Sequence, residues 1–346
     1  MHEVGVKKNF GKIFAKWQRL IFFILVIVGF TLLLPGRFLT WTNMRNNLYA
    51  VSLTGIMCCG ATFCVLLGGI DRAVAGNGAM ASAACCAWIV SHGYTNQSAL
   101  VGILIGLSIA TFSGFLHGLV LANFDIPAFL LTLASNQILY GLVRVLLGNA
   151  LLVVMEPPLF TAIGTRQIFG IPFPVYMLLI CFLLSTFILN HTTYGRRVYM
   201  VGGNREASHL SGINVKKITI TAYTISGFMA GIAGIILASM NCQGDAKACE
   251  GYENDVLAAI VLGGVSIRGG SGKIWQSMYG VILIGIIVNG MRLMGLNVAY
   301  HDMVKGIIII IAVALDAYTR RRASGMLHEG LFKRWRHKHL KKIAAG

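Results

Sequence analysis

The chain has 346 residues, of which 56% are hydrophobic and only 12% are charged, with a mean hydropathy of +0.73. Soluble domains carry about 25% charged residues, so this composition excludes a soluble globule and indicates a protein embedded in lipid. The formal net charge of +17 is typical either of nucleic-acid binding or of the inner loops of a membrane protein.

Apolar windows recur along the chain at lengths that suit transmembrane helices, which need about 20 apolar residues. We therefore predict an all-α, polytopic membrane protein of about ten segments. The expected spans are residues 20–34, 47–69, 74–90, 99–122, 127–147, 172–190, 217–240, 255–267, 274–292 and 301–317. The span at 255–267 is too short to cross alone, so we expect a broken or re-entrant helix there.

The placement of the cations favours the membrane explanation of the charge. With ten spans both termini lie on one side, and most of the 29 Lys and Arg residues fall on that side. The positive-inside rule then puts both termini in the cytoplasm and makes nucleic-acid binding unnecessary. We expect a basic N-terminal segment at 1–19, a membrane domain at 20–318 and a basic tail at 319–346. The first apolar run ends in Pro35-Gly36-Arg37, which is not a signal-peptide cleavage site.

The sequence contains no complete enzyme motif. The segment Gly269–Lys273 looks like a phosphate loop, but Ile267 and Ile274 occupy the Gly and Ser/Thr positions that a Walker A motif requires. The sequence has no zinc-ligand spacing and no nucleophile elbow. We predict no catalytic site, no metal and no cofactor, and any energy from ATP has to come from a partner.

Two glycine-rich breaks interrupt apolar sequence, at residues 67–78 and 262–272. They lie near the start of each half of the chain or a little beyond, which is compatible with a two-half repeat. Such breaks either line a solute pathway, as discontinuous helices do in transporters, or are tight turns between helices. The candidate pathway residues are Asp71, Arg72, Ala73 and Gly76 in the first break and Gly263, Gly264, Ser266 and Gly269 in the second.

The longest inner loop covers residues 194–215. Asn204 is suited to cap a short helix from Arg205 to Leu210, and Gly212 is suited to close it. The loop is either a docking helix or a solvated connector that carries topogenic charge. The candidate docking residues are Gly203, Asn204, Arg205, Glu206, Ala207 and Gly212.

Small residues and cysteines are expected to serve packing. The pairs Gly102/Gly106, Gly114/Gly118 and Gly227/Gly231 have the spacing that lets helices approach closely in lipid. Six of the eight cysteines fall in spans and are interpreted as apolar fillers. Cys242 and Cys249 lie in a polar outer loop, where the spacing allows either a disulfide or two free thiols.

The two breaks and the docking loop, taken together, carry a family resemblance, and the first break contributes Gly69-Ile70-Asp71. The loop contains Thr193-Tyr194-Gly195-Arg196, Gly202-Gly203-Asn204-Arg205-Glu206-Ala207 and Gly212-Ile213. The region of the second break contains Tyr252-Glu253-Asn254-Asp255, Val261-Leu262-Gly263-Gly264 and Gly269-Gly270-Ser271-Gly272. Further matches are Ile126-Pro127-Ala128-Phe129, Thr132-Leu133-Ala134, Lys305-Gly306 and Ala314-Leu315-Asp316. From about residue 40 to 318 the chain resembles the permease subunit of bacterial ATP-binding-cassette (ABC) importers for sugars, of the ribose, galactose, arabinose and autoinducer-2 group.

The resemblance implies a dimer of permease subunits in the bacterial inner membrane. It also implies an ABC ATPase that docks on the inner loops and a periplasmic binding protein that delivers a ribose-like pentose or a hexose. One departure stands out: the family usually has Leu-Ser after the Gly-x-Ile-Asp of the first break, and this chain has Arg72-Ala73. Two alternatives are an ion-coupled secondary transporter and a membrane-embedded enzyme, for which the isolated His117 offers no catalytic cluster.

Overall fold

The chain forms a bundle of helices, and the structure, a computed structural model, describes residues 21–148 and 150–323. The long helices are Ile21–Leu33, α2 (Trp41–Leu66), α3 (Val74–Ser91), α4 (Asn96–Asn123), α5 (Ala128–Leu147), α7 (Phe173–His191), α10 (Val215–Asn241), α12 (Ile274–Leu293) and α13 (Val298–Ala323). The shorter helices are α6 (Pro158–Thr165), α8 (Thr193–Gly203), α9 (Arg205–Leu210) and α11 (Tyr252–Gly263). The expected segment 1–19 and most of the expected tail at 319–346 lie outside the described residues.

Seven described helices are long and apolar enough to cross a membrane: α2, α3, α4, α5, α7, α10 and α12. The other three predicted spans also fall on helices. Helix Ile21–Leu33 is short, α13 carries Asp302 and Lys305 near its start, and α11 has only 12 residues. The prediction that the segment at 255–267 is too short to cross alone is therefore confirmed, whereas the count of ten spans and the two-half repeat stay predictions.

Local capping sets several of the helix boundaries. The Thr95 side chain accepts a hydrogen bond from Ser98 N while the Ser98 side chain accepts one from Thr95 N, so α4 begins with a capping box. The Thr40 hydroxyl caps α2 in the same manner by accepting from Asn43 N. Gly148, in the left-handed conformation, ends α5.

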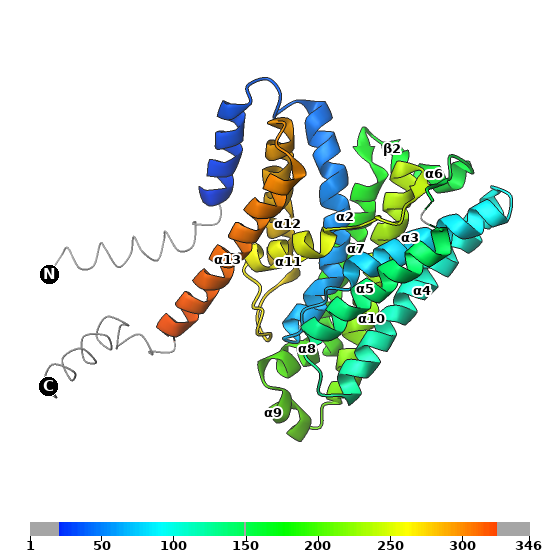
Figure 1. Ribbon diagram of the computed structural model, residues 1–346. Coiled ribbons are helices and arrows are strands. Elements are labelled where there is room, and N and C mark those ends of the chain that lie inside the picture. The colour runs from blue at the N-terminus through cyan, green and yellow to red at the C-terminus, as the bar shows by residue number, and fades with distance from the viewer. Residues whose placement is uncertain (1–20, 149, 324–346) are drawn as a thin grey trace, which may run out of the picture.

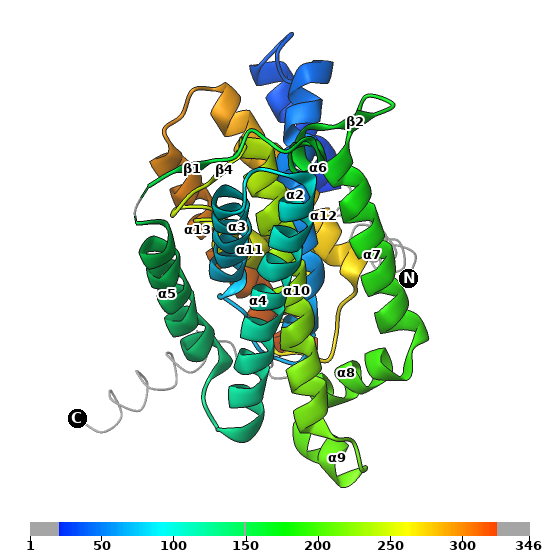
Figure 2. The ribbon, with the colours of Figure 1, turned by 90° about the vertical axis from the view of Figure 1, so that its right-hand side faces the viewer.

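The centre of the bundle is α10, which packs against α4, α2 and α3. Figure 2 shows α5 and α7 on opposite sides of this group. A Cβ atom on Gly114 of α4 would lie only 3.0 Å from Gly227 Cα of α10, and a Cβ atom on Gly102 would lie 2.9 Å from the Cys85 carbonyl of α3. These contacts confirm that the glycine pairs serve close helix packing.

The structure adds elements that the sequence analysis did not predict. Helix α6 lies in the segment between α5 and α7, where its Gly164 N donates to Ser239 Oγ of α10 over 2.7 Å. Two short antiparallel pairs are also present: β1 (Leu152–Val153) pairs with β4 (Gln243–Gly244), and β2 (Gln167–Ile168) pairs with β3 (Ile171–Pro172).

The cysteines are free thiols, and this corrects one alternative for Cys242 and Cys249. The buried Cys249 Sγ lies against Gly78 of α3, whereas the Cys242 thiol donates to Ser239 O over 3.5 Å. The two side chains therefore point to different neighbours, and the disulfide is not formed. The six other cysteines are buried, as expected for apolar fillers.

Candidate coupling and translocation sites

Three glycine-rich segments that are far apart in the sequence meet at the C-terminal end of α2. Gly270 N, in the second break, donates to Leu66 O over 2.8 Å. A Cβ atom on Gly269 would lie 2.6 Å from Gly68 N in the first break. A Cβ atom on Gly202, in α8, would lie 2.6 Å from Gly270 N and would also collide with Leu66 O. We call this contact between Leu66, Gly68, Gly202, Gly269 and Gly270 the glycine joint.

A hydrogen bond outside the joint strengthens the link between α8 and the second break. The Tyr199 hydroxyl of α8 donates to Gly272 O over 2.8 Å. The docking loop and both breaks, which the sequence analysis treated as separate motifs, are thus in direct backbone contact. A displacement of α8 has to move either the end of α2 or the second break, because main chain packs on main chain without intervening side chains.

The short helix predicted at Arg205–Leu210 is present, whereas its docking role stays a prediction. Asn204 Oδ1 accepts from Ala207 N over 2.9 Å and caps α9 at Arg205–Leu210, and Gly212 has the positive φ of +78° that closes the turn. The six predicted docking residues, Gly203, Asn204, Arg205, Glu206, Ala207 and Gly212, are all exposed. Leu210 is 84% exposed, although it is apolar. Figure 1 shows α8 and α9 at the lower end of the bundle, away from the loop between Ile21–Leu33 and α2.

The first break is held by buried polar contacts. Asp71, which is 5% exposed, accepts hydrogen bonds from Ser226 Oγ at 2.6 Å and from Ala73 N at 2.9 Å. Thr132 Oγ1 accepts from Arg72 N at 3.0 Å, and Asn136 Oδ1 accepts from Gly76 N at 2.8 Å. These acceptors satisfy backbone N–H groups near the start of α3, so the irregular backbone is stable inside the bundle.

Asp71 and Arg72 do not offset each other's charge, since their side chains contact different elements. The Arg72 guanidinium donates to Asn254 Oδ1 over 3.1 Å, lies 3.7 Å from Glu253 Oε1 and stacks 5.7 Å above the Phe129 ring. The arginine that departs from the usual pattern thus has an acidic partner in the first turn of α11.

The eight predicted pathway residues differ in exposure. Asp71, Ala73, Gly76, Gly263 and Ser266 are buried, Arg72 and Gly269 are partly exposed, and Gly264 is exposed. The buried members pack within the chain, as the tight-turn interpretation requires. Their role in a pathway stays a prediction.

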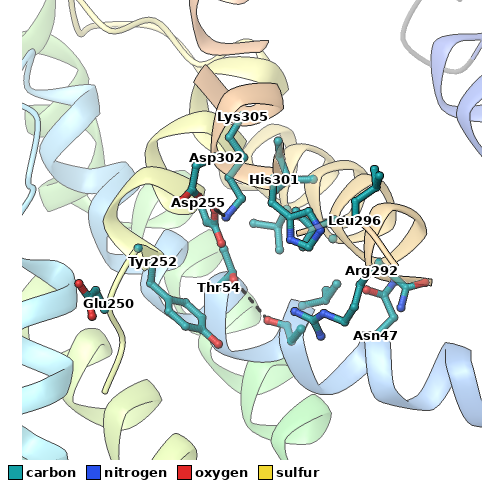
Figure 3. Close-up of a pocket in the computed structure, with 18 residues that line it drawn as sticks. Asn47, Thr54, Glu250, Tyr252, Asp255, Arg292, Leu296, His301, Asp302 and Lys305 are labelled. Atoms are coloured by element: carbon teal, nitrogen blue, oxygen red, sulfur yellow. Dashed lines mark hydrogen bonds and ion pairs between the residues drawn. The ribbon is translucent and has the colours of Figure 1, made fainter. Parts of the chain in front are cut away.

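A polar cavity of about 570 Å³ lies elsewhere, between α2, α11, α12 and α13. Figure 3 shows Tyr252, Arg292 and His301 directed into it from three helices. Lys305 Nζ lies 2.7 Å from Asp255 Oδ1 and 3.7 Å from Asp302 Oδ1. None of these residues was among the predicted site residues, although Tyr252, Asp255 and Lys305 stand in the motifs that carry the family resemblance. A further signal was the occurrence of Arg292 and Lys305 inside apolar segments, where charges are costly.

The known proteins to which this chain is similar are sugar permeases, and the similarity extends over nearly the whole chain. The L-arabinose transport system permease protein AraH of Escherichia coli (strain K12) is 34% identical over 315 residues, covering 90% of this chain and 94% of that protein. The ribose import permease protein RbsC of Bacillus subtilis (strain 168) is 35% identical over 317 residues, covering 91% of this chain and 95% of that protein. No solved structure matches the chain. Residues 43–313 match the model of the branched-chain amino acid transport system / permease component, and the chain belongs to this permease family.

Proposed function

We propose that this chain is the membrane-spanning subunit of an ABC importer that translocates a monosaccharide. The observation that carries the proposal is the similarity to arabinose and ribose permeases at 34–35% identity over about nine-tenths of the chain. A polytopic bundle with seven candidate spans is suited to this role. ATP hydrolysis would take place in a partner subunit.

The proposed assembly contains two permease subunits, identical or homologous, two ABC ATPase subunits and a periplasmic sugar-binding protein, all at the bacterial inner membrane. Both termini would lie in the cytoplasm together with α8 and α9. Supporting this orientation, the segments at the α9 end of the bundle carry Arg196, Arg197, Arg205, Lys216, Lys217, Arg268 and Lys273.

The glycine joint connects the helix proposed to bind the ATPase with the segments proposed to translocate the solute. An ATPase that moves α9 would pull on α8, and α8 contacts both the end of α2 and the second break. The second break joins α11 to α12, and these helices line the polar cavity. Movement at the docking helix is thereby transmitted to the walls of the cavity through backbone contacts.

The alternative of an ion-coupled transporter would need acidic groups available to bind an ion in the membrane. Asp71 accepts two hydrogen bonds from the protein, and Asp302 lies 3.7 Å from Lys305. Neither arrangement favours ion coupling.

The test is uptake of radiolabelled L-arabinose and D-ribose into proteoliposomes. These contain the chain with the ATPase and binding protein encoded beside its gene. We expect uptake that requires both partners and ATP. The double variant Glu206→Arg/Ala207→Trp should abolish uptake, whereas Leu104→Trp, on an exposed apolar position of α4, should not. Uptake driven by an ion gradient without the ATPase, or normal uptake by the double variant, would contradict the proposal.

A further inference from the structure

The polar cavity is at the opposite end of the bundle from the docking helix. Its α2 residues, from Asn47 to Thr54, lie in the first half of that helix, whereas the glycine joint is at its end. Its α12 and α13 residues, such as Arg292 and His301, lie near the turn that joins these two helices. The cavity therefore lies in the half of the bundle that is remote from α9.

One buried polar atom of the cavity has neither a hydrogen bond nor an ion pair within the described residues. His301 is 5% exposed, and its Nε2 atom has no hydrogen-bond partner within residues 21–148 and 150–323. The exposed Arg292 guanidinium and the partly buried Asn47 amide also line the cavity. Asn289, by contrast, is fully engaged in a reciprocal pair of 2.9 Å hydrogen bonds with Asn43. A buried polar atom without a partner is costly, and a polar ligand would satisfy it.

The charges of the cavity disfavour an anionic ligand. Its lining has three carboxylates, from Glu250, Asp255 and Asp302, and two permanent cations, from Arg292 and Lys305. Lys305 is already paired with two of the carboxylates. The cavity thus has no excess positive charge, although it has both hydrogen-bond donors and acceptors.

We propose that this cavity binds an uncharged polyhydroxylated solute of monosaccharide size, and that Tyr252, Arg292 and His301 contact it. The inference rests on the proposed function and assigns the solute site to one place in the chain. Hydroxyl groups both donate and accept, which suits the carboxylate, amide and guanidinium groups side by side. The Tyr252 ring offers an apolar face, and about 570 Å³ is within the usual range of small-molecule sites.

A second cavity of the same volume shows that this lining is not general to the bundle. It also measures about 570 Å³, and its walls are almost entirely apolar, with Phe23, Trp41 and Ile282 among them. Hydroxyl groups in that cavity would lose hydrogen bonds with water and gain none in return. Only the cavity of Tyr252, Arg292 and His301, of these two, has chemistry suited to a sugar.

The first experiment uses the complete importer in proteoliposomes, with D-ribose and L-arabinose as probes. Uptake by Arg292→Gln, His301→Ala and Tyr252→Phe should fall about tenfold, while ATP hydrolysis stimulated by the loaded binding protein stays at the wild-type level. Arg166→Gln, which changes an exposed arginine outside the cavity, is the control and should transport normally. Normal uptake by all three cavity variants would overturn the inference. Absence of uptake by the wild type would instead overturn the proposed function, and this inference with it.

The second experiment does not depend on substituting a polar cavity residue. Ala50→Cys is placed in the cavity wall in a Cys242→Ser background, since Cys242 is the one native cysteine that is not buried. A small hydrophilic thiol reagent should label this cysteine. D-ribose or L-arabinose at about 10 mM, on the order of the concentration that saturates a weak binding site, should slow the labelling several-fold. Leu104→Cys, on the apolar surface of α4, should show no slowing. No labelling at residue 50, or equal protection by glucuronate, would overturn the proposed site or its preference for uncharged solutes.

Discussion

The Arg72 guanidinium lies 3.7 Å from a Glu253 carboxylate oxygen and joins the first glycine break to the first turn of α11. Both side chains are largely buried, with 16% and 12% of their surface exposed. The second contact of Arg72, to Asn254, connects residues that are 182 positions apart. The unusual arginine therefore fixes the position of α11, which forms one wall of the polar cavity.

Replacing this arginine should destabilise the protein. Arg72→Leu leaves the Glu253 carboxylate without its cation, so we expect a loss of about 1–3 kcal/mol in the free energy of unfolding. Adding Glu253→Gln should recover part of the loss because the unpaired charge is removed. Thermal unfolding in detergent measures both effects, with the exposed Arg166→Leu as the control. An equal loss of unfolding free energy in the single and double variants would show that the ion pair does not stabilise the protein.

The glycine joint predicts a strong effect from one methyl group. In Gly202→Ala the new Cβ would collide with Leu66 O and Gly270 N, so α8 has to move away from the second break. We expect uptake to fall at least tenfold, while α9, whose own cap is unaltered, still binds the ATPase. Gly141→Ala in α5 is the matched control because no atom lies within 4 Å of its Cβ position. Wild-type uptake by Gly202→Ala would mean that the joint does not transmit movement.

Features of the sequence that act over a few residues were predictable. The cap at Asn204 and the turn at Gly212 are local, and they gave helix α9 with correct bounds. Apolar length located the helices, and glycine spacing indicated close helix packing at the glycine pairs of α4 and α10, although not which helices they contact. Each of these signals depends on the chemistry of one short segment.

Contacts between distant segments were not predictable from one sequence. Asp71 and Ser226 are 155 residues apart, and no local pattern indicates that they share a hydrogen bond. The cavity is assembled from four helices, so its polar residues appeared as isolated charges. The disulfide alternative for Cys242 and Cys249 was wrong for a related reason. The sequence spacing shows only that the two residues could come close enough to bond, whereas the direction of the Cys249 side chain is set by its packing against α3.

The thiols provide a direct check of that packing. Since all eight cysteines are free, the intact mass of the non-denatured protein should be the same with and without reductant. A hydrophilic alkylating reagent should modify Cys242 readily and Cys249 only after unfolding, because Cys249 is 2% exposed. Mass spectrometry of peptides separates the two sites. A bridged peptide containing both cysteines would contradict the structure.

The crossing of α4 and α10 should be among the least tolerant places in the bundle. A methyl group in Gly114→Ala would collide with Tyr223 O and approach Gly227 Cα to 3.0 Å, so the two backbones have to separate. We expect a cost of about 1–3 kcal/mol, seen as a lower melting temperature in detergent. In Gly141→Ala the same change meets open space and should be neutral or stabilising by about 0.5–1 kcal/mol. If the two variants had the same melting temperature, the close glycine contact would not be a source of stability. The surrounding side chains alone would then hold the two helices together.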